Sequence, residues 1–227
     1  GMINPQTGRG AWSPDTLASF ICGFSVAASR ADSELWQDAG KTILGTAASD
    51  PVRVWGDTLS AIEATSPGDS NRAILDGASQ WWLKGNGSSR YFEIPSGTFP
   101  TGSADRTFAV AFRVNNFSTD QGLFSYGNNA TGEAVYLRIG TDKKLSITQW
   151  GASVGGALTT LAENTWYRLI VTVSGGVWTA WLDGTPEGNP TTMGTNTADT
   201  TAKLFTDGLS EYFNGDIAAF VATGAAV

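Results

Sequence analysis

The residue types that most enzymes use for catalysis or metal binding are scarce in this sequence. It has no histidine and one cysteine, Cys22, among 227 residues. Ser-His-Asp or Cys-His catalysis and His-based zinc or iron sites are therefore excluded. A lone cysteine provides neither a thiolate-rich zinc centre nor an intramolecular disulfide, and there is no P-loop or dinucleotide-binding glycine fingerprint. The chemistry that is left is that of carboxylates and of ligand binding.

Carboxylates alone can support glycoside hydrolysis, which needs two of them about 5–10 Å apart. Asp32 and Glu34 are spaced by two residues, but they do not belong to a clear strand with a third acid. The sequence therefore predicts a protein that is not an enzyme, with a glycoside hydrolase as the less favoured alternative.

Three aspartates are the candidates for a calcium site, because Asp76, Asp183 and Asp216 each flank a glycine in a turn-like context. Calcium takes six to eight oxygen ligands, and no dense Asp-x-Asp-x-Asp spacing supplies them here. We favour the alternative that these side chains bond to turn backbones, and we predict no cofactor.

Carbohydrate binding is the activity that the sequence supports best. Sugars are held by aromatic faces and a few directional polar groups. In residues 135–139 and 145–150, apolar side chains alternate with others, which predicts two strands with one face in a core. If the strands are neighbours, the opposite face carries the candidate glycan-binding residues Tyr136, Arg138, Thr148 and Trp150. The alternative is that another chain covers this face or that it is solvated surface.

Period-two alternation recurs along the second half of the chain and predicts an all-β protein. Residues 107–114 form one such run, and residues 166–173 and 177–183 form a hairpin around Gly175-Gly176. Adjacent strand residues face opposite ways, so one of Trp81 and Trp82 is expected in the core and the other outside.

Other segments are less regular. Residues 40–70 are predicted to be loop with one or two short strands, and residues 186–201 a polar loop. Residues 17–28 are apolar, but Pro14 and Asp15 precede them and no lysine cluster does, so a strand is favoured over a signal peptide.

Composition and charge agree with a β-rich protein. The 28 glycines and the 15% of charged residues suit many turns between short strands. The net charge of −7 opposes binding to nucleic acid or to a membrane, because both are anionic. We find no internal repeat and predict a single domain over residues 1–227, in which residues 1–30 are a lead-in with one strand.

Three segments carry a family resemblance. Residues 166–184, with an aromatic at the start and Asp183-Gly184 at the end, resemble the hairpin of laminin-G-like domains. Phe213-Asn-Gly-Asp-Ile217 resembles the closing strand of that family, and Ala73–Gly77 an early strand. The resemblance implies a laminin-G/concanavalin A-like jelly roll, a sandwich of two antiparallel sheets. Glucanases of this architecture carry Glu-x-Asp-x-x-Glu on one strand, a pattern that this chain lacks.

The N-terminal part resembles a lead-in found in phage and prophage proteins that bear this domain, at residues 34–44 and 50–57. This implies a phage virion or the bacterial exterior as the location. Two hypotheses follow for the function. One is a glycan-binding module of a phage-related or bacterial surface protein, and the other is a structural module that self-associates or binds virion proteins.

Overall fold

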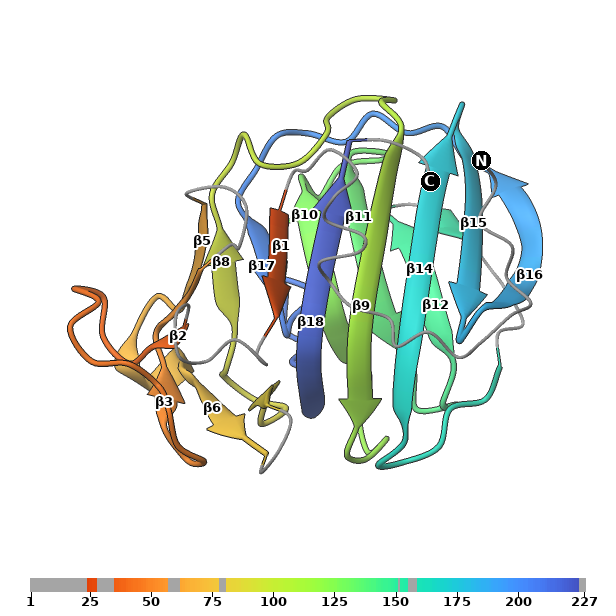
Figure 1. Cartoon of the computed structure of the whole chain (residues 1–227). Coiled ribbons are helices and arrows are strands. Elements are labelled where there is room, and N and C mark those ends of the chain that lie inside the picture. The colour runs from red at the N-terminus through yellow and green to blue at the C-terminus, as the bar shows by residue number, and fades with distance from the viewer. Residues whose placement is uncertain are drawn as a thin grey trace, which may run out of the picture.

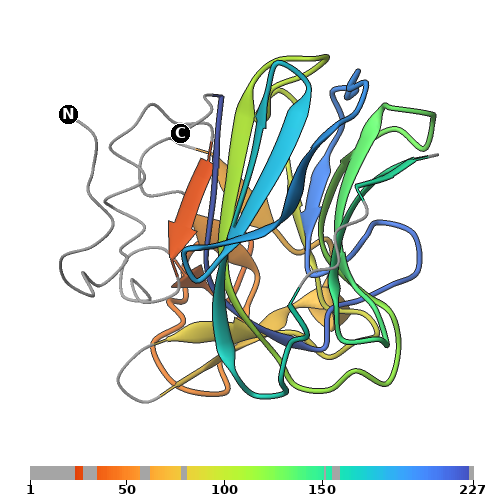
Figure 2. The ribbon, with the colours of Figure 1, turned by 90° about the vertical axis from the view of Figure 1, so that its right-hand side faces the viewer.

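The computed structural model describes residues 24–27, 35–56, 62–77, 81–150, 152–154 and 159–224. Two antiparallel β-sheets pack face to face, and Figure 1 looks onto one of them with the other behind it. Figure 2 shows the two layers from the side. The predicted all-β sandwich is therefore confirmed. In the described ranges there is one short 3-10 turn, η2 (Asp69–Asn71), and no helix long and apolar enough to cross a membrane.

Each sheet contains nine of the described strands. The first, which we call the β9 sheet, runs in the order β16 (Thr185–Thr192), β15 (Val177–Leu182), β14 (Trp166–Ser174), β9 (Arg106–Val114), β18 (Gly215–Thr223), β7 (Trp82–Lys84), β6 (Ala73–Asp76) and β3 (Pro51–Val52), with β1 (Phe24–Ala27) also paired to β18. The second, the β10 sheet, runs in the order β13 (Ala152–Val154), β12 (Leu145–Gln149), β11 (Ala134–Ile139), β10 (Gln121–Gly127), β17 (Ala202–Leu204), β8 (Phe92–Ile94), β5 (Glu63–Thr65), β4 (Val54–Gly56) and β2 (Leu35–Trp36).

Aromatic rings from both sheets meet in the core. Phe124 of β10 lies 4.7 Å from Phe220 of β18 and 5.2 Å from Phe108 of β9, measured between ring centroids. All three side chains are fully buried. Because β9 and β18 lie side by side and each contacts β10 through these rings, the apolar faces of the sheets hold the layers together.

The alternation predicted for the hairpin is also present. Val171 and Val173 of β14 and Trp178 of β15 are buried, so one tryptophan of the hairpin is in the core. Trp82 lies on the outer face of the β9 sheet, while Trp81 packs against the core, as the alternation predicted.

Two predictions for irregular segments were wrong. Residues 185–192 form strand β16, although the sequence predicted a polar loop from residue 186. This strand lies at the edge of the β9 sheet and pairs on one side only, where prolines and exposed polar residues are tolerated. The described residues between 40 and 70 contain three short strands, β3, β4 and β5, rather than one or two.

Glycine at position 122 allows a loop to cross β10 at close range. A Cβ atom on Gly122 would lie 1.9 Å from the backbone nitrogen of Asp207 and 2.5 Å from the carbonyl carbon of Thr206. A β-bulge interrupts the pairing of β10 with β11 at the same place. The approach of residues 206–207 to the sheet therefore depends on the missing side chain.

We expect Gly122→Ala to lower the free energy of unfolding by at least about 2 kcal/mol, because backbone must move to admit the methyl group. Urea unfolding would measure the loss. Gly194→Ala is the matched control, since nothing lies within 4 Å of its Cβ position. Equal stability of the two variants would contradict the close approach.

Candidate functional site

A row of polar side chains crosses the outer face of the β10 sheet in register. Lys203 of β17 pairs with Ser125 of β10, which pairs with Tyr136 of β11, which pairs with Thr148 of β12. On the other side of Lys203, the register partner is Glu93 of β8. Residues directly opposite on paired strands share a face, so one line of polar groups spans five strands.

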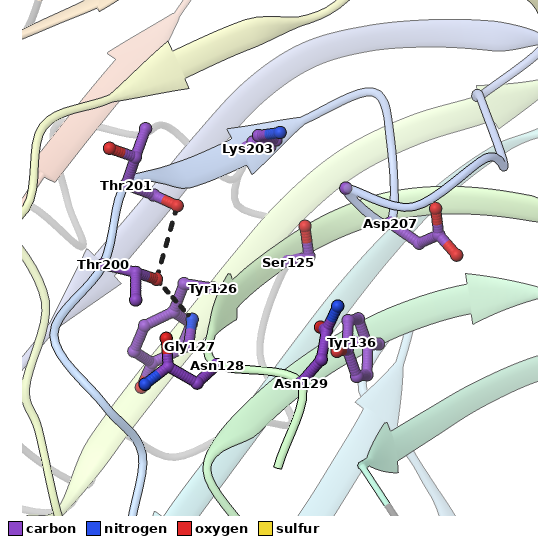
Figure 3. A pocket seen from close by; sticks show the side chains of 11 residues that line it. Ser125, Tyr126, Gly127, Asn128, Asn129, Tyr136, Thr200, Thr201, Lys203 and Asp207 are labelled. Carbon is purple, nitrogen blue, oxygen red and sulfur yellow. Dashed lines mark hydrogen bonds between the residues drawn. The ribbon is translucent and has the colours of Figure 1, made fainter.

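A groove of about 360 Å³ opens along this row. Ser125, Tyr136 and Lys203 supply its sheet side, and loops supply the rest, as Figure 3 shows. The loop residues that line it are Asn128, Asn129, Thr200, Thr201, Asp207 and Gly208, and Tyr126 and Gly127 at the end of β10 complete the set. The volume falls in the lower part of the range of small-molecule sites, and the lining is mostly polar.

Hydrogen bonds fix several of these groups before any ligand arrives. The Tyr136 hydroxyl donates to Asn129 Oδ1 at 2.6 Å, and the Gly127 N–H donates to Thr200 Oγ1 at 2.8 Å. The Ser125 hydroxyl donates to the carbonyl of Thr206 at 3.3 Å. The polar groups of the groove are therefore held in place, which lowers the entropy cost of binding.

Burial raises the pKa of the Tyr136 hydroxyl above its ordinary value of 10.0; the nearby Asp207 carboxylate adds to this, and Arg138 opposes it. Tyr136 thus remains a hydrogen-bond donor throughout the neutral range. Its contribution to stability is present below pH 10 and is lost as the pH rises through the raised pKa.

One wall of the groove is the loop of residues 206–211, which Asp207 organises. Its Oδ1 accepts the backbone N–H groups of Leu209, Ser210 and Glu211 at 2.9, 3.2 and 3.0 Å. The Asp207 side chain is almost completely buried, so these bonds compensate for the lost solvation of its charge.

Arg138 connects this loop to the sheet. Its Nε donates to Glu211 Oε2 at 2.8 Å, its Nη2 donates to Glu211 Oε1, and the same Nη2 lies 3.6 Å from Asp207 Oδ2. The pKa of Arg138 is raised because the hydrogen bond and charge of Glu211 outweigh the effect of burial. One guanidinium therefore holds two carboxylates of the loop, in the two-pronged geometry that makes arginine pairs strong.

The four predicted glycan-binding residues lie in different places relative to the groove. Tyr136, Arg138 and Thr148 do lie on neighbouring strands and on one face, as predicted. Only Tyr136 lines the groove, because Arg138 is bound by the loop acids and Thr148 lies one strand further away. β12 ends at the buried Gln149, so Trp150, 39% exposed, follows the strand in a turn and does not line the groove.

The other groove residues were missed by the sequence analysis. Lys203 stands in a strand of three residues, too short to show alternation, and Asn128 and Asn129 lie in the connection between β10 and β11, where no alternation applies. Asp207 lies in a loop whose approach to the sheet depends on the distant Gly122. The local sequence contains no signal for that contact.

The three calcium candidates lie apart from the groove lining and have other partners. Asp76 Oδ1 accepts the N–H of Gly77 at 2.8 Å, and Asp183 Oδ1 accepts the N–H of Arg168 at 2.9 Å. Asp76 therefore bonds to the residue that follows it, whereas the backbone partner of Asp183 lies in strand β14 rather than in a turn. In the described ranges, no three acidic, histidine or cysteine side chains gather in a way that could hold a metal ion.

Asp216 differs, because it stands inside strand β18 rather than in a turn. Its Oδ2 accepts from Arg113 Nε and Nη2 at 2.8 and 2.6 Å, and its side chain is fully buried. Burial raises the pKa of this carboxyl, although Arg113 opposes the shift. The Arg113 guanidinium carbon lies 5.0 and 5.2 Å from the ring centroids of Trp82 and Trp166. This cation–π contact gives Trp82 a partner on the outer face of the β9 sheet.

A jelly-roll sandwich with a polar groove on the outer face of one sheet defines a domain of the concanavalin A class. The sequence agrees with this, since the laminin-G model of the concanavalin A-like lectin/glucanases superfamily matches residues 86–224. The chain therefore belongs to this superfamily. The match begins after the segments that form β1 to β7 and includes every residue of the groove.

Solved structures with the same fold come from carbohydrate-active proteins. Trypanosoma rangeli sialidase in complex with the inhibitor DANA matches with a TM-score of 0.61 at 13% identity, over 90% of this chain and 30% of that one. Domain 4 of the extracellular arabinanase AbnA from Geobacillus stearothermophilus, in complex with arabinotriose, matches with a TM-score of 0.52 at 13% identity. This match covers 91% of this chain and 94% of that one. An arabinofuranosidase complexed with arabinofuranosyl-α-1,2-xylobiose matches with a TM-score of 0.62 at 12% identity, over 90% of this chain and 59% of that one.

These identities show a common fold only. The chain spans about a third of the length of the sialidases it matches. A comparison with curated proteins finds no match.

Arg138→Gln should loosen the loop of residues 206–211, because Glu211 and Asp207 lose their shared cation. We expect the amides of Leu209, Ser210 and Glu211 to exchange with deuterium about tenfold faster or more, in line with the strength of hydrogen bonds to charged groups. Arg168→Gln is the control, because its ion pair with Asp183 is 50% and 41% exposed. Unchanged exchange in the Arg138 variant would show that the loop does not depend on it.

The raised pKa of Tyr136 can be measured by an ultraviolet titration of the phenol groups. The difference between the titration curves of the unaltered chain and of Tyr136→Phe should have its midpoint above pH 10, since burial disfavours the phenolate. A midpoint at or below pH 10 would mean that Tyr136 is solvated.

Proposed function

We propose that this protein is a non-catalytic carbohydrate-binding module whose site is the groove on the outer face of the β10 sheet. The observation that carries the proposal is the in-register row Lys203, Ser125 and Tyr136, which fixed loop side chains surround. Directional hydrogen-bonding groups held at a concave surface are what sugar recognition requires.

The ligands of structural neighbours support the same class of function. The arabinanase domain was solved with arabinotriose, and its match covers nearly its whole length. Because the identity is 13%, it supports carbohydrate binding in general rather than one sugar.

The state of the acids supports binding rather than hydrolysis. Glycosidases use a pair of carboxylates, one of which must exchange a proton. In the described part of the groove lining, Asp207 is the one acid, and its Oδ1 is held by three backbone amides. A surface location on a phage or bacterium stays a prediction from the N-terminal resemblance, as does self-association.

Titration calorimetry with arabinotriose, lactose and 3′-sialyllactose would test the proposal. Asn129→Ala should weaken the binding of any sugar that binds about tenfold, because it removes an amide that faces the groove. Asn189→Ala is the matched control, since that residue is exposed on the edge strand β16. If no sugar binds, or if both variants bind equally well, the groove is not a carbohydrate site.

A further inference from the structure

Two polar side chains that line the groove, Asn129 and Lys203, keep hydrogen-bond donors that no residue in the described part of the chain accepts. Asn129 uses its oxygen to accept from Tyr136, which leaves the two N–H groups of its amide. Lys203 adds the three N–H groups of an ammonium. On the acceptor side, Asp207 Oδ1 is already occupied by three amides. A ligand that brings acceptors would satisfy these donors, while Asp207 Oδ2 and the hydroxyl oxygens of Ser125 and Tyr136 can still accept from it.

Lys203 has no carboxylate partner in the described part of the chain. Glu93 stands opposite it in register, yet the Lys203 ammonium lies over the ring of Tyr91, 5.5 Å from the centroid, rather than in an ion pair with Glu93. Gly208 lies along the stem of the side chain, since a Cβ on Gly208 would be 3.5 Å from Lys203 Cδ. Lys203 is thus a half-buried residue that lines the groove, and its ammonium lies over the neutral ring of Tyr91.

We propose that the groove selects sugars that carry a carboxylate, with the Lys203 ammonium and the Asn129 amide as its donors. This inference rests on the proposed function, and it names the class of sugar. Hydrogen bonds between an ammonium and a carboxylate are roughly twice as strong as neutral ones, so the acid group is the part of a sugar that gains most from Lys203.

The charges around the groove are compatible with an anionic sugar. Asp207 is the acid in the lining, and Arg138 lies 3.6 Å from its Oδ2 but also pairs with Glu211, so it compensates the charge of Asp207 only in part. Glu133 accepts from Asn128 Nδ2 at 3.3 Å, and Glu93 lies on the strand beyond Lys203. The net charge of −7 acts at longer range, where salt screens it, whereas the contact with Lys203 is short.

The test compares two sugars that differ only in the acid group, methyl β-D-glucuronide and methyl β-D-glucoside, together with 3′-sialyllactose and lactose. We expect the acidic member of each pair to bind on the order of tenfold more tightly, and this preference to weaken as sodium chloride is added. Lys203→Gln should abolish the preference, and Lys203→Arg should restore most of it. Lys84→Gln, which removes the same charge on the β9 sheet, should change nothing.

The outcomes separate the two proposals. Equal binding of acidic and neutral sugars, or a preference that survives Lys203→Gln, overturns the selection for acids and leaves a carbohydrate-binding groove. A complete absence of binding by all four sugars overturns the groove itself. Unfolding curves of the Lys203 variants should match that of the unaltered chain, because the side chain stands on the outer face of its sheet.

Discussion

The register of β17, β10, β11 and β12 is the constraint on which both the core and the groove depend. Side chains alternate with a period of two, so the register that sends Phe124, Leu137 and Ile147 inward also aligns the polar row outside. A slip of one residue in any of these strands would bury part of the row and expose part of the core. The stability of the sandwich therefore enforces the arrangement of the proposed site.

A buried arginine secures the end of the groove near Tyr126. Arg106 is fully buried, and its guanidinium donates to Tyr126 Oη, to Thr197 Oγ1 at 2.9 Å and to the carbonyls of Gly102 and Ala104 at 2.7 and 2.8 Å. Burial raises the pKa of Tyr126, while the Arg106 charge opposes the shift. A buried cation is costly unless its donors are used, so this cluster ties β9, β10 and the loop before β17 into one arrangement.

The sequence predicted the parts of the structure that local patterns encode. Alternation identified β9, β11, β12 and the hairpin of β14 and β15, and it placed Tyr136, Arg138 and Thr148 on one face. It could not predict which strands from distant parts of the chain would join them. Lys203 reaches the row because β17 pairs with β10, and Asp207 because Gly122 admits its loop. Arg138 was predicted to contact a ligand, but nothing in the sequence around it indicated that Glu211 would be its partner.

The partners of the acids at this groove are the reason for proposing sugar binding rather than hydrolysis. A carboxylate that exchanges protons or attacks a sugar needs an oxygen that is free to react. Here Asp207 accepts hydrogen bonds from backbone amides, and Glu211 forms an ion pair with Arg138. Both acids therefore stabilise the loop that forms the wall of the groove. Releasing either acid for chemistry would leave buried N–H groups or an arginine without partners. This use of the acids supports the proposal of a rigid surface that binds a sugar without transforming it.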